Sequence, residues 1–271
     1  MLKKRVIPVL YLKNGLLVRS QQFRNFSELG NPINQLERLN NWQADELIYI
    51  DITRDGEHNL GRVDHKIRNQ SSILNTLHEI SKCCFMPLTF GGRINTFKQA
   101  VDFVSGGADK VIINTGAYRN PKLITQIAEY YGSQCVVIGI DVKRIDGKLY
   151  LVIDQGRELI VADSPEIWAK KVVDLGAGEI FVNSIDRDGM ANGFDIEAVN
   201  LITSAVRVPV VACGGGGSFK DFIEVFQKTE ASAVAAGNIF NFTENAYIRS
   251  KKALLLAGCC IKPNNVIEKS F

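Results

Sequence analysis

One pattern repeats along the whole sequence: a short apolar segment, a turn rich in Gly, Asn or Asp, and a segment with the apolar spacing of an amphipathic helix. The apolar segments do not alternate with polar residues, which is typical of strands covered on both faces, as in parallel sheets. We expect strands at 6–12, 47–52, 86–90, 110–114, 135–142, 180–183, 208–213 and 231–236. We expect helices near 31–43, 65–82, 95–105, 120–131, 164–175, 194–205, 217–228 and 243–257.

Eight strand–helix units in 271 residues predict an α/β fold, a single (β/α)₈ barrel domain that spans residues 1–271. A doubly wound open sheet of eight strands is the alternative. The connection 143–163 is longer than the others, and we interpret it as a β-excursion that follows the fifth strand.

Three pairs of motifs repeat at about half the length of the chain. Residues 9–13 (Val-Leu-Tyr-Leu-Lys) parallel 139–143 (Gly-Ile-Asp-Val-Lys), and 48–56 parallel 180–189. Pro-Leu-Thr-Phe-Gly-Gly at 87–92 parallels Pro-Val-Val-Ala-Cys-Gly-Gly at 209–215. The repeat predicts two half-barrel copies, at about 1–131 and 132–260.

Composition bears on the partners of the protein and on the compartment where it works. The net charge of +3 is small and no Lys/Arg-rich run is present, so we expect no nucleic-acid partner. The six cysteines lack a C-x-x-C spacing and are interpreted as reduced thiols of a cytoplasmic protein. The apolar run at 6–12 is too short for a signal peptide and contains Pro8, and no stretch approaches the roughly 18 residues of a membrane helix.

Glycines follow several of the expected strands, at the barrel end where active sites are built. Backbone N–H groups exposed by glycine can approach a phosphate, and the loops after strands seven and eight are a common phosphate site. The alternative is that these glycines only make tight turns. The repeat predicts a second phosphate site across the mouth. The candidate phosphate-binding residues are Gly91, Gly92, Asn114, Thr115, Gly189, Gly214, Gly215, Gly216, Gly237 and Asn238.

Carboxylates just beyond barrel strands are candidate general acids or bases. Asp141 ends the fifth strand and is the principal candidate, and Asp51 ends the second. Asp186 and Asp188 lie in the turn after strand six, where turn or capping roles are an equal alternative. The histidines (58, 65 and 78) show no metal-ligand spacing, and we expect neither a metal nor another cofactor.

Taken together, these motifs resemble the family of cyclase subunits of imidazole glycerol phosphate synthase, which are histidine-biosynthesis barrels. The resemblance runs from residue 4 to about 257. It includes Gly-Ala-Asp-Lys-Val-Ile-Ile-Asn-Thr at 107–115, Ile-Asp-Val-Lys-Arg at 140–144, Asn-Ser-Ile-Asp-Arg-Asp-Gly at 183–189 and Cys-Gly-Gly-Gly-Gly at 213–217.

The resemblance implies a lyase in which ammonia from a glutaminase subunit enters the bottom of the barrel and attacks a bisphosphate ligand at the top. It implies a heterodimer with that glutaminase, docked through Asp109. It assigns an ammonia gate to Arg5, Glu46, Lys110 and Glu179, and catalytic positions to Asp141, Tyr11 and Lys13.

The chain departs from the family pattern at three places. Tyr11 replaces the first of two catalytic aspartates, Arg93 replaces a glycine of a phosphate turn, and Gly237-Asn238 replaces a serine region. Because tyrosine has an ordinary pKa near 10, it is a poor general base at neutral pH. Three functions therefore stay open: a cyclase; a barrel that relays ammonia to a sugar amidotransferase in surface-polysaccharide biosynthesis; and a sugar isomerase of the same superfamily.

Overall fold

Eight parallel strands form a closed ring in the computed structural model, which describes residues 3–54 and 72–263. These strands are β1 (Arg5–Lys13), β4 (Leu47–Asp51), β5 (Leu88–Gly91), β6 (Lys110–Ile113), β7 (Val136–Ile145), β10 (Glu179–Ser184), β11 (Val210–Cys213) and β12 (Ala233–Ala236). Neighbours along this order pair in parallel, β12 pairs with β1, and β7 pairs with β10.

The predicted (β/α)₈ barrel is therefore confirmed, and the doubly wound alternative is wrong. A doubly wound sheet keeps two edge strands, whereas here the pairing of β1 with β12 joins the first strand to the last. All eight expected strands are present, with ends that differ from the predicted ones by a few residues.

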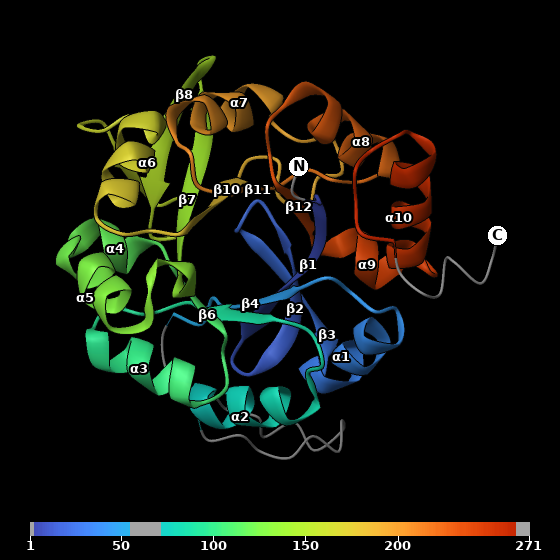
Figure 1. Cartoon of the computed structure of the whole chain (residues 1–271), viewed down its shortest axis with the longest axis horizontal. Helices are drawn as coiled ribbons and strands as arrows, with labels where there is room; N and C mark the ends of the chain where they lie inside the picture. Colours follow the sequence, from blue (N-terminus) through green and yellow to red (C-terminus); the bar gives the residue numbers. More distant parts are fainter. Residues whose placement is uncertain (1–2, 55–71, 264–271) are drawn as a thin grey trace.

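Helices surround the ring on its outside (Figure 1). They are α1 (Pro32–Asn41), α2 (Ile73–Cys83), α3 (Phe97–Ser105), α4 (Thr115–Arg119), α5 (Lys122–Tyr131), α6 (Pro165–Asp174), α7 (Ile196–Ala205), α8 (Phe219–Lys228), α9 (Asn238–Phe242) and α10 (Ala246–Leu256), with a 3₁₀ turn at Ser133–Cys135. The expected helix at 65–82 matches α2 in its second half, and residues 65–71 lie outside the described part. The short helices α4 and α9 were not predicted.

Two β-excursions rise from the ring. The predicted one follows β7, which continues into an antiparallel pair with β8 (Lys148–Ile153), and β8 pairs with β9 (Glu158–Ile160). The other was missed: β1 turns into β2 (Leu16–Gln21), which pairs with β3 (Asn25–Gly30). Its first turn, at Asn14-Gly15, is a two-residue Asn-Gly turn typical of a hairpin, with φ values of +54° and +82°. This signal was overlooked, because the apolar residues of β2 continue those of β1.

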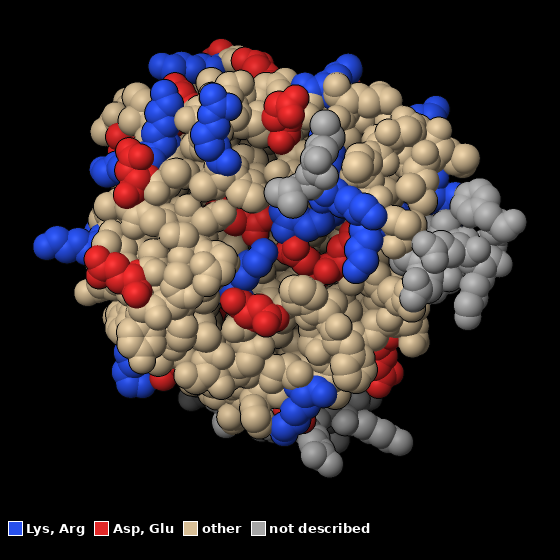
Figure 2. Space-filling model, viewed as in Figure 1, with Lys and Arg blue, Asp and Glu red and all other residues tan. Residues whose placement is uncertain are grey.

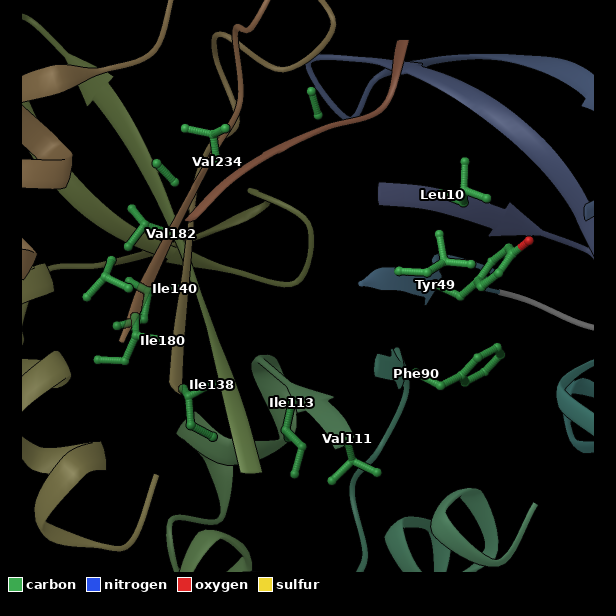
Figure 3. Close-up of a cluster of buried hydrophobic side chains, with 14 of the residues drawn as sticks. Leu10, Tyr49, Phe90, Val111, Ile113, Ile138, Ile140, Ile180, Val182 and Val234 are labelled. Carbon is green, nitrogen blue, oxygen red and sulfur yellow. The ribbon is translucent and has the colours of Figure 1, made fainter. Parts of the chain in front are cut away.

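Buried apolar side chains form two layers. The outer layer fills the space between strands and helices and includes Leu10, Tyr49, Phe90, Val111 and Ile138 (Figure 3). The inner layer contains side chains of strands and loops only and fills the barrel. Because neighbouring residues of a strand face opposite sides, Leu10 joins the outer layer while Val9 and Tyr11 join the inner one.

The paired sequence motifs lie on strands four places apart in the ring, namely β1 and β7, β4 and β10, and β5 and β11. The division into two half-barrel copies remains a prediction. Within the described residues, no helix combines the length and the apolar character needed to cross a bilayer.

A buried ion pair ties the last helix to the start of the barrel. The fully buried ammonium group of Lys251 lies 2.7 Å from both carboxylate oxygens of Asp45, and Asp45 also accepts a hydrogen bond from the backbone N–H of Val6. This pair holds α10 against the segment that leads into β4.

We predict that Lys251→Met destabilises the fold by about 3–5 kcal/mol, because it leaves the Asp45 carboxylate buried without its cation. Urea unfolding measures the change. Lys252→Met alters the exposed neighbouring lysine and is the control, for which we expect a change within about 0.5 kcal/mol. Equal losses in both variants would contradict a stabilising role for the pair.

Candidate functional site

Two pockets open at the C-terminal ends of the barrel strands. The first, called here the Arg93 pocket, has a volume of about 310 Å³, and the second, the Arg19 pocket, about 260 Å³. The Arg93 pocket is lined among others by Gly92, Arg93, Asn114, Thr115, Asp141 and Asn183. The Arg19 pocket is lined among others by Arg19, Asp188, Gly189, Cys213, Gly214, Gly215, Gly216, Gly237 and Asn238.

The structure thus places most of the predicted phosphate-binding residues in two groups on either side of the mouth. Gly91 is the exception, since it ends β5 and does not line the Arg93 pocket.

Lys13, the third predicted catalytic residue, does not line the pocket that contains Asp141. It lines a third cavity of about 680 Å³ beside the mouth, where its ammonium group stacks 4.6 Å from the centre of the Phe26 ring.

Asp141 is the buried carboxyl group of the Arg93 pocket. Its side chain accepts a long hydrogen bond of 3.4 Å from the Asn183 amide. Burial raises the pKa of Asp141 to about 7, and the nearby carboxyl group of Asp188 adds to the shift, while hydrogen bonds from Asn183 and Asn114 oppose it. A carboxyl group with this pKa can accept or release a proton at neutral pH, as a general acid or base requires.

Asp188 is a second buried carboxyl group, on the other side of the mouth. Burial raises its pKa to about 6, against hydrogen bonds that include the backbone N–H of Phe23, and one of its oxygens has no partner among the described residues. From the sequence, a turn or capping role and a general acid or base role were equal alternatives for Asp188. The structure places it in a pocket, and the feature that pointed to it in the sequence was its position in the turn after a barrel strand.

Tyr11 lies between these two acids. Its ring packs edge-on against Phe23, with 5.2 Å between ring centres, and its hydroxyl group is buried without a hydrogen-bond partner in the described part of the chain. Burial raises the pKa of Tyr11 well above its usual value, and Asp188, Cys213 and Asp141 raise it further. Tyr11 is therefore neutral at physiological pH and cannot replace an aspartate base.

The glycines of the strand-seven loop are required by close packing. Gly214 and Gly215 have φ values of +90° and +102°, and a Cβ atom on Gly215 would lie 2.0 Å from the carbonyl oxygen of Gly193. This requirement exists with or without a ligand, so the glycines alone do not identify a phosphate site.

A stronger sign of anion binding was missed in the sequence. Arg19, on β2, lines the Arg19 pocket, and its guanidinium group lies 5.5 Å from the ring centre of Phe242. Its Nε atom is buried with no hydrogen-bond partner among the described residues. Asn14-Gly15 is a hairpin signal that precedes Arg19 in the sequence, but the hairpin was not predicted and Arg19 was missed with it.

Arg93 keeps the backbone conformation of the glycine that it replaces. Its φ of +62° lies in the left-handed region, which costs a residue with a side chain about 1 kcal/mol or more. Its exposed side chain lines the Arg93 pocket, together with Arg54, Arg119 and Arg157. Strain that persists at a pocket is typical of a functional residue.

The turn between β8 and β9 forms a roof over the Arg93 pocket. The backbone N–H of Asp154 donates to the hydroxyl oxygen of Thr115 at 2.9 Å, and the side chain of Gln155 donates to the carbonyl oxygen of Ile52. The hydroxyl proton of Thr115 stays available to a ligand.

Four charged side chains close the opposite, N-terminal end of the barrel. Arg5 contacts Glu46 at 2.5 Å and Glu179 at 2.6 Å, and Lys110 contacts the same two carboxylates at 3.3 and 2.9 Å. Figure 2 shows acidic and basic side chains side by side at the centre of one face. Burial alone would raise the pKa of Glu179, but Arg5 and Lys110 hold it below its usual value.

Asp109 lies at this same end, next to Lys110. Its backbone N–H donates to the carbonyl oxygen of Leu88, and its carboxylate accepts a hydrogen bond from the N–H of Leu88, both at 2.8 Å. The side chain is exposed, so it can also meet a partner, but any substitution there has to preserve the acceptor.

The raised pKa of Asp141 predicts a pH-dependent loss of stability. The folded state holds this proton more tightly than the unfolded state, so the contribution is complete below about pH 4 and is lost as the pH rises through about 7. Asp141→Asn has no such loss. We expect it to be more stable than the wild type at pH 8, by up to about 4 kcal/mol, with the difference shrinking toward pH 4. Urea unfolding at pH 4.5 and 8 measures this, and a difference independent of pH would contradict the prediction.

Comparison with known proteins places the chain in a family. The family model described as histidine biosynthesis protein matches residues 5–246. The chain is 37% identical to imidazole glycerol phosphate synthase subunit HisF of Chlorobium luteolum, over 97% of this chain and 100% of that protein. It is 39% identical to the HisF subunit of Bacillus cereus and 37% identical to that of Alkaliphilus metalliredigens, in each case over 94% of this chain and 96% of the relative.

The family match covers the barrel from β1 to the beginning of α10, and each of these relatives aligns with at least 94% of the chain. The chain therefore belongs to the histidine biosynthesis protein family and, within it, to the imidazole glycerol phosphate synthase subunits HisF.

Proposed function

We propose that the chain is a cyclase-type HisF subunit, which receives ammonia from a glutaminase partner at the N-terminal end of the barrel and uses it on a bisphosphate ligand at the C-terminal end. The observation that carries the proposal is Asp141, a buried carboxyl group with a pKa of about 7 that lines the arginine-containing Arg93 pocket. Its HisF relatives are named as subunits of imidazole glycerol phosphate synthase, which supports a partner of this kind.

The two pockets suit the two phosphate groups of such a ligand. Each combines an arginine with backbone amides of a glycine-containing loop, a pairing that recognises phosphate by charge and by hydrogen bonding. Arg19 serves one pocket and Arg93 the other. The roof over the Arg93 pocket would exclude water around the ligand.

The barrel interior suits the passage of ammonia. Between the charged ring and the mouth, most inward-facing side chains are apolar, and they include Ile7, Val9, Ile48, Val137 and Phe181, while the buried Thr89 of β5 is polar. A neutral ammonia molecule can cross such a column, whereas an ammonium ion would lose its hydration without compensation. The ring of Arg5, Glu46, Lys110 and Glu179 would be the gate, since one ion pair has to open to admit ammonia.

At the mouth, Asp141 would act as a general base or acid on the ligand. Asp188 would supply a second carboxyl group near the reacting atoms, on the side of the mouth opposite Asp141.

Tyr11 favours a second candidate. With a neutral, buried tyrosine in the place of the strand-one aspartate, the chain would lack one of the two catalytic carboxylates of its family. A divergent member of this kind would bind the phosphorylated ligand, activate its glutaminase and pass ammonia to a sugar amidotransferase in surface-polysaccharide biosynthesis.

Turnover of the family's bisphosphate intermediate in ammonium buffer separates the candidates. For a cyclase, we expect the rate to rise with pH through about 7, as Asp141 ionises, and Asp141→Asn to lower it by about 10²–10⁴-fold and abolish the pH dependence. Tyr11→Asp should raise the wild-type rate. If both the wild type and Tyr11→Asp bind the ligand without turnover, the cyclase function is contradicted and the ammonia-relay function is favoured.

The docking face can be tested without catalysis. Asp109→Asn keeps an oxygen that accepts the hydrogen bond from Leu88 but removes the charge, so we expect weaker binding to a HisH-type glutaminase, by about threefold to tenfold. Asp146→Asn is the control, because Asp146 is exposed in the β7–β8 turn, beyond the opposite end of the barrel. Calorimetric titration measures both affinities, and equal effects would contradict the proposed orientation.

A further inference from the structure

The third cavity at the mouth lies between the two β-excursions and is the largest of the three described here. Its volume is about 680 Å³, and its lining comes from the ends of β1 and β7 and from the turns of both excursions. We call it the vestibule. Five cationic side chains and one carboxylate line it: Lys13, Arg24, Arg54, Lys143, Arg157 and Asp186.

Two of these cations extend the barrel interior by one level at the mouth. Side chains two residues apart on a strand point to the same side, so Lys13 follows Tyr11 on β1, and Lys143 follows Asp141 on β7. The two strands carry one of the paired sequence motifs, in which the two lysines occupy equivalent positions. The repeat therefore brings two cations to the vestibule from strands four places apart in the ring.

Most of the positive charge in the vestibule has no acidic partner. Arg157 pairs with Asp154 at 2.7 Å, whereas Arg54 donates to the neutral amide oxygen of Gln155 at 2.6 Å. Asp186 forms no ion pair with any of the five cations. Within the described residues, the cations without a carboxylate in ion-pair distance are Lys13, Arg24, Arg54 and Lys143.

Cations gathered around one cavity repel one another and raise the local concentration of anions. Arginine and lysine donors on several sides suit a group with many oxygens and several negative charges, such as two linked phosphates. We propose that the vestibule is a third anion-binding site, which takes a diphosphate group in addition to the two phosphates held by the pockets. The inference goes beyond the proposed function, because neither pocket is lined by Lys13, Arg24 or Lys143.

The vestibule adjoins the Arg93 pocket and shares no lining residue with the Arg19 pocket. Five residues line both the vestibule and the Arg93 pocket: Phe23, Ile52, Arg54, Gln155 and Arg157. An anion in the vestibule would therefore lie beside a ligand in the Arg93 pocket, and changes at Arg54 or Arg157 would affect both. Arg24 and Lys143 line the vestibule alone among the three cavities, so changes there report on it specifically.

Titration calorimetry with inorganic pyrophosphate tests the site. The starting protein is Arg19→Gln/Arg93→Gln, in which each phosphate pocket loses the arginine that names it. We expect this protein to bind one pyrophosphate per chain. Adding Arg24→Gln and Lys143→Gln should weaken the binding by at least about tenfold, because two of the five cations around the anion become neutral.

The matched control adds Lys122→Gln and Lys148→Gln to the same starting protein. Both lysines are exposed and line none of the three cavities, so their loss should change the affinity by less than about twofold. Thermal unfolding checks the fold of every variant. If the variant with Lys143→Gln is misfolded, Arg24→Gln alone replaces it, with an expected weakening of about threefold.

The inference and the proposed function fail in different ways. If the starting protein binds no pyrophosphate, or if the vestibule changes and the control changes weaken binding equally, the third site is overturned. Neither result affects the two phosphate pockets, which are tested with methyl phosphate. If Arg19→Gln and Arg93→Gln leave the binding of methyl phosphate to the chain unchanged, the phosphate pockets of the proposed function are wrong, whatever the vestibule binds.

Discussion

Closure of the eight-stranded ring by the pairing of β1 with β12 is the constraint on which the rest of this structure depends. Once the ring is closed, alternate side chains of every strand must face its interior, where no solvent can reach most of them. The interior then has three levels: paired charges at the N-terminal end, mostly apolar side chains in the middle, and polar groups at the mouth. The charges pair and the apolar side chains pack together, whereas the mouth keeps buried polar atoms, such as the Tyr11 hydroxyl, without a hydrogen-bond partner among the described residues.

Burial at the mouth gives the site its chemical character. The same desolvation raises the pKa of Asp141, Asp188 and Tyr11, but with different consequences. It brings the pKa values of the two carboxyl groups close to neutral pH, where they can exchange protons. It keeps the Tyr11 phenol protonated. The phenol at this position is therefore neutral and cannot act as the aspartate base that it replaces.

The predictions from sequence succeeded where one strand or loop carried the signal by itself. The barrel strands were recognised because each is apolar on both faces, and the β8–β9 excursion because its connection is long. The β2–β3 excursion was missed although Asn14-Gly15 marks the turn from β1 into β2, because its apolar residues continue those of β1. Because this excursion was missed, Arg19 and Phe23 were missed too, although both line pockets at the mouth. The glycines at 214 and 215 were correctly placed at the mouth, but packing against neighbouring loops already requires them.

The sequence by itself determined the closed barrel, the family and the end of the barrel at which the polar groups meet, because these follow from periodicity, repeats and motifs within short segments. Only the tertiary structure decided which polar groups meet at the mouth and how burial changes them. Tyr11, Phe23, Asp141 and Asp188 are far apart along the chain, and their effects on one another depend on burial and distance, which local sequence does not encode. The sequence indicates that Tyr11 replaces a base, and the tertiary structure adds that its hydroxyl group is buried at the mouth, where burial keeps it protonated.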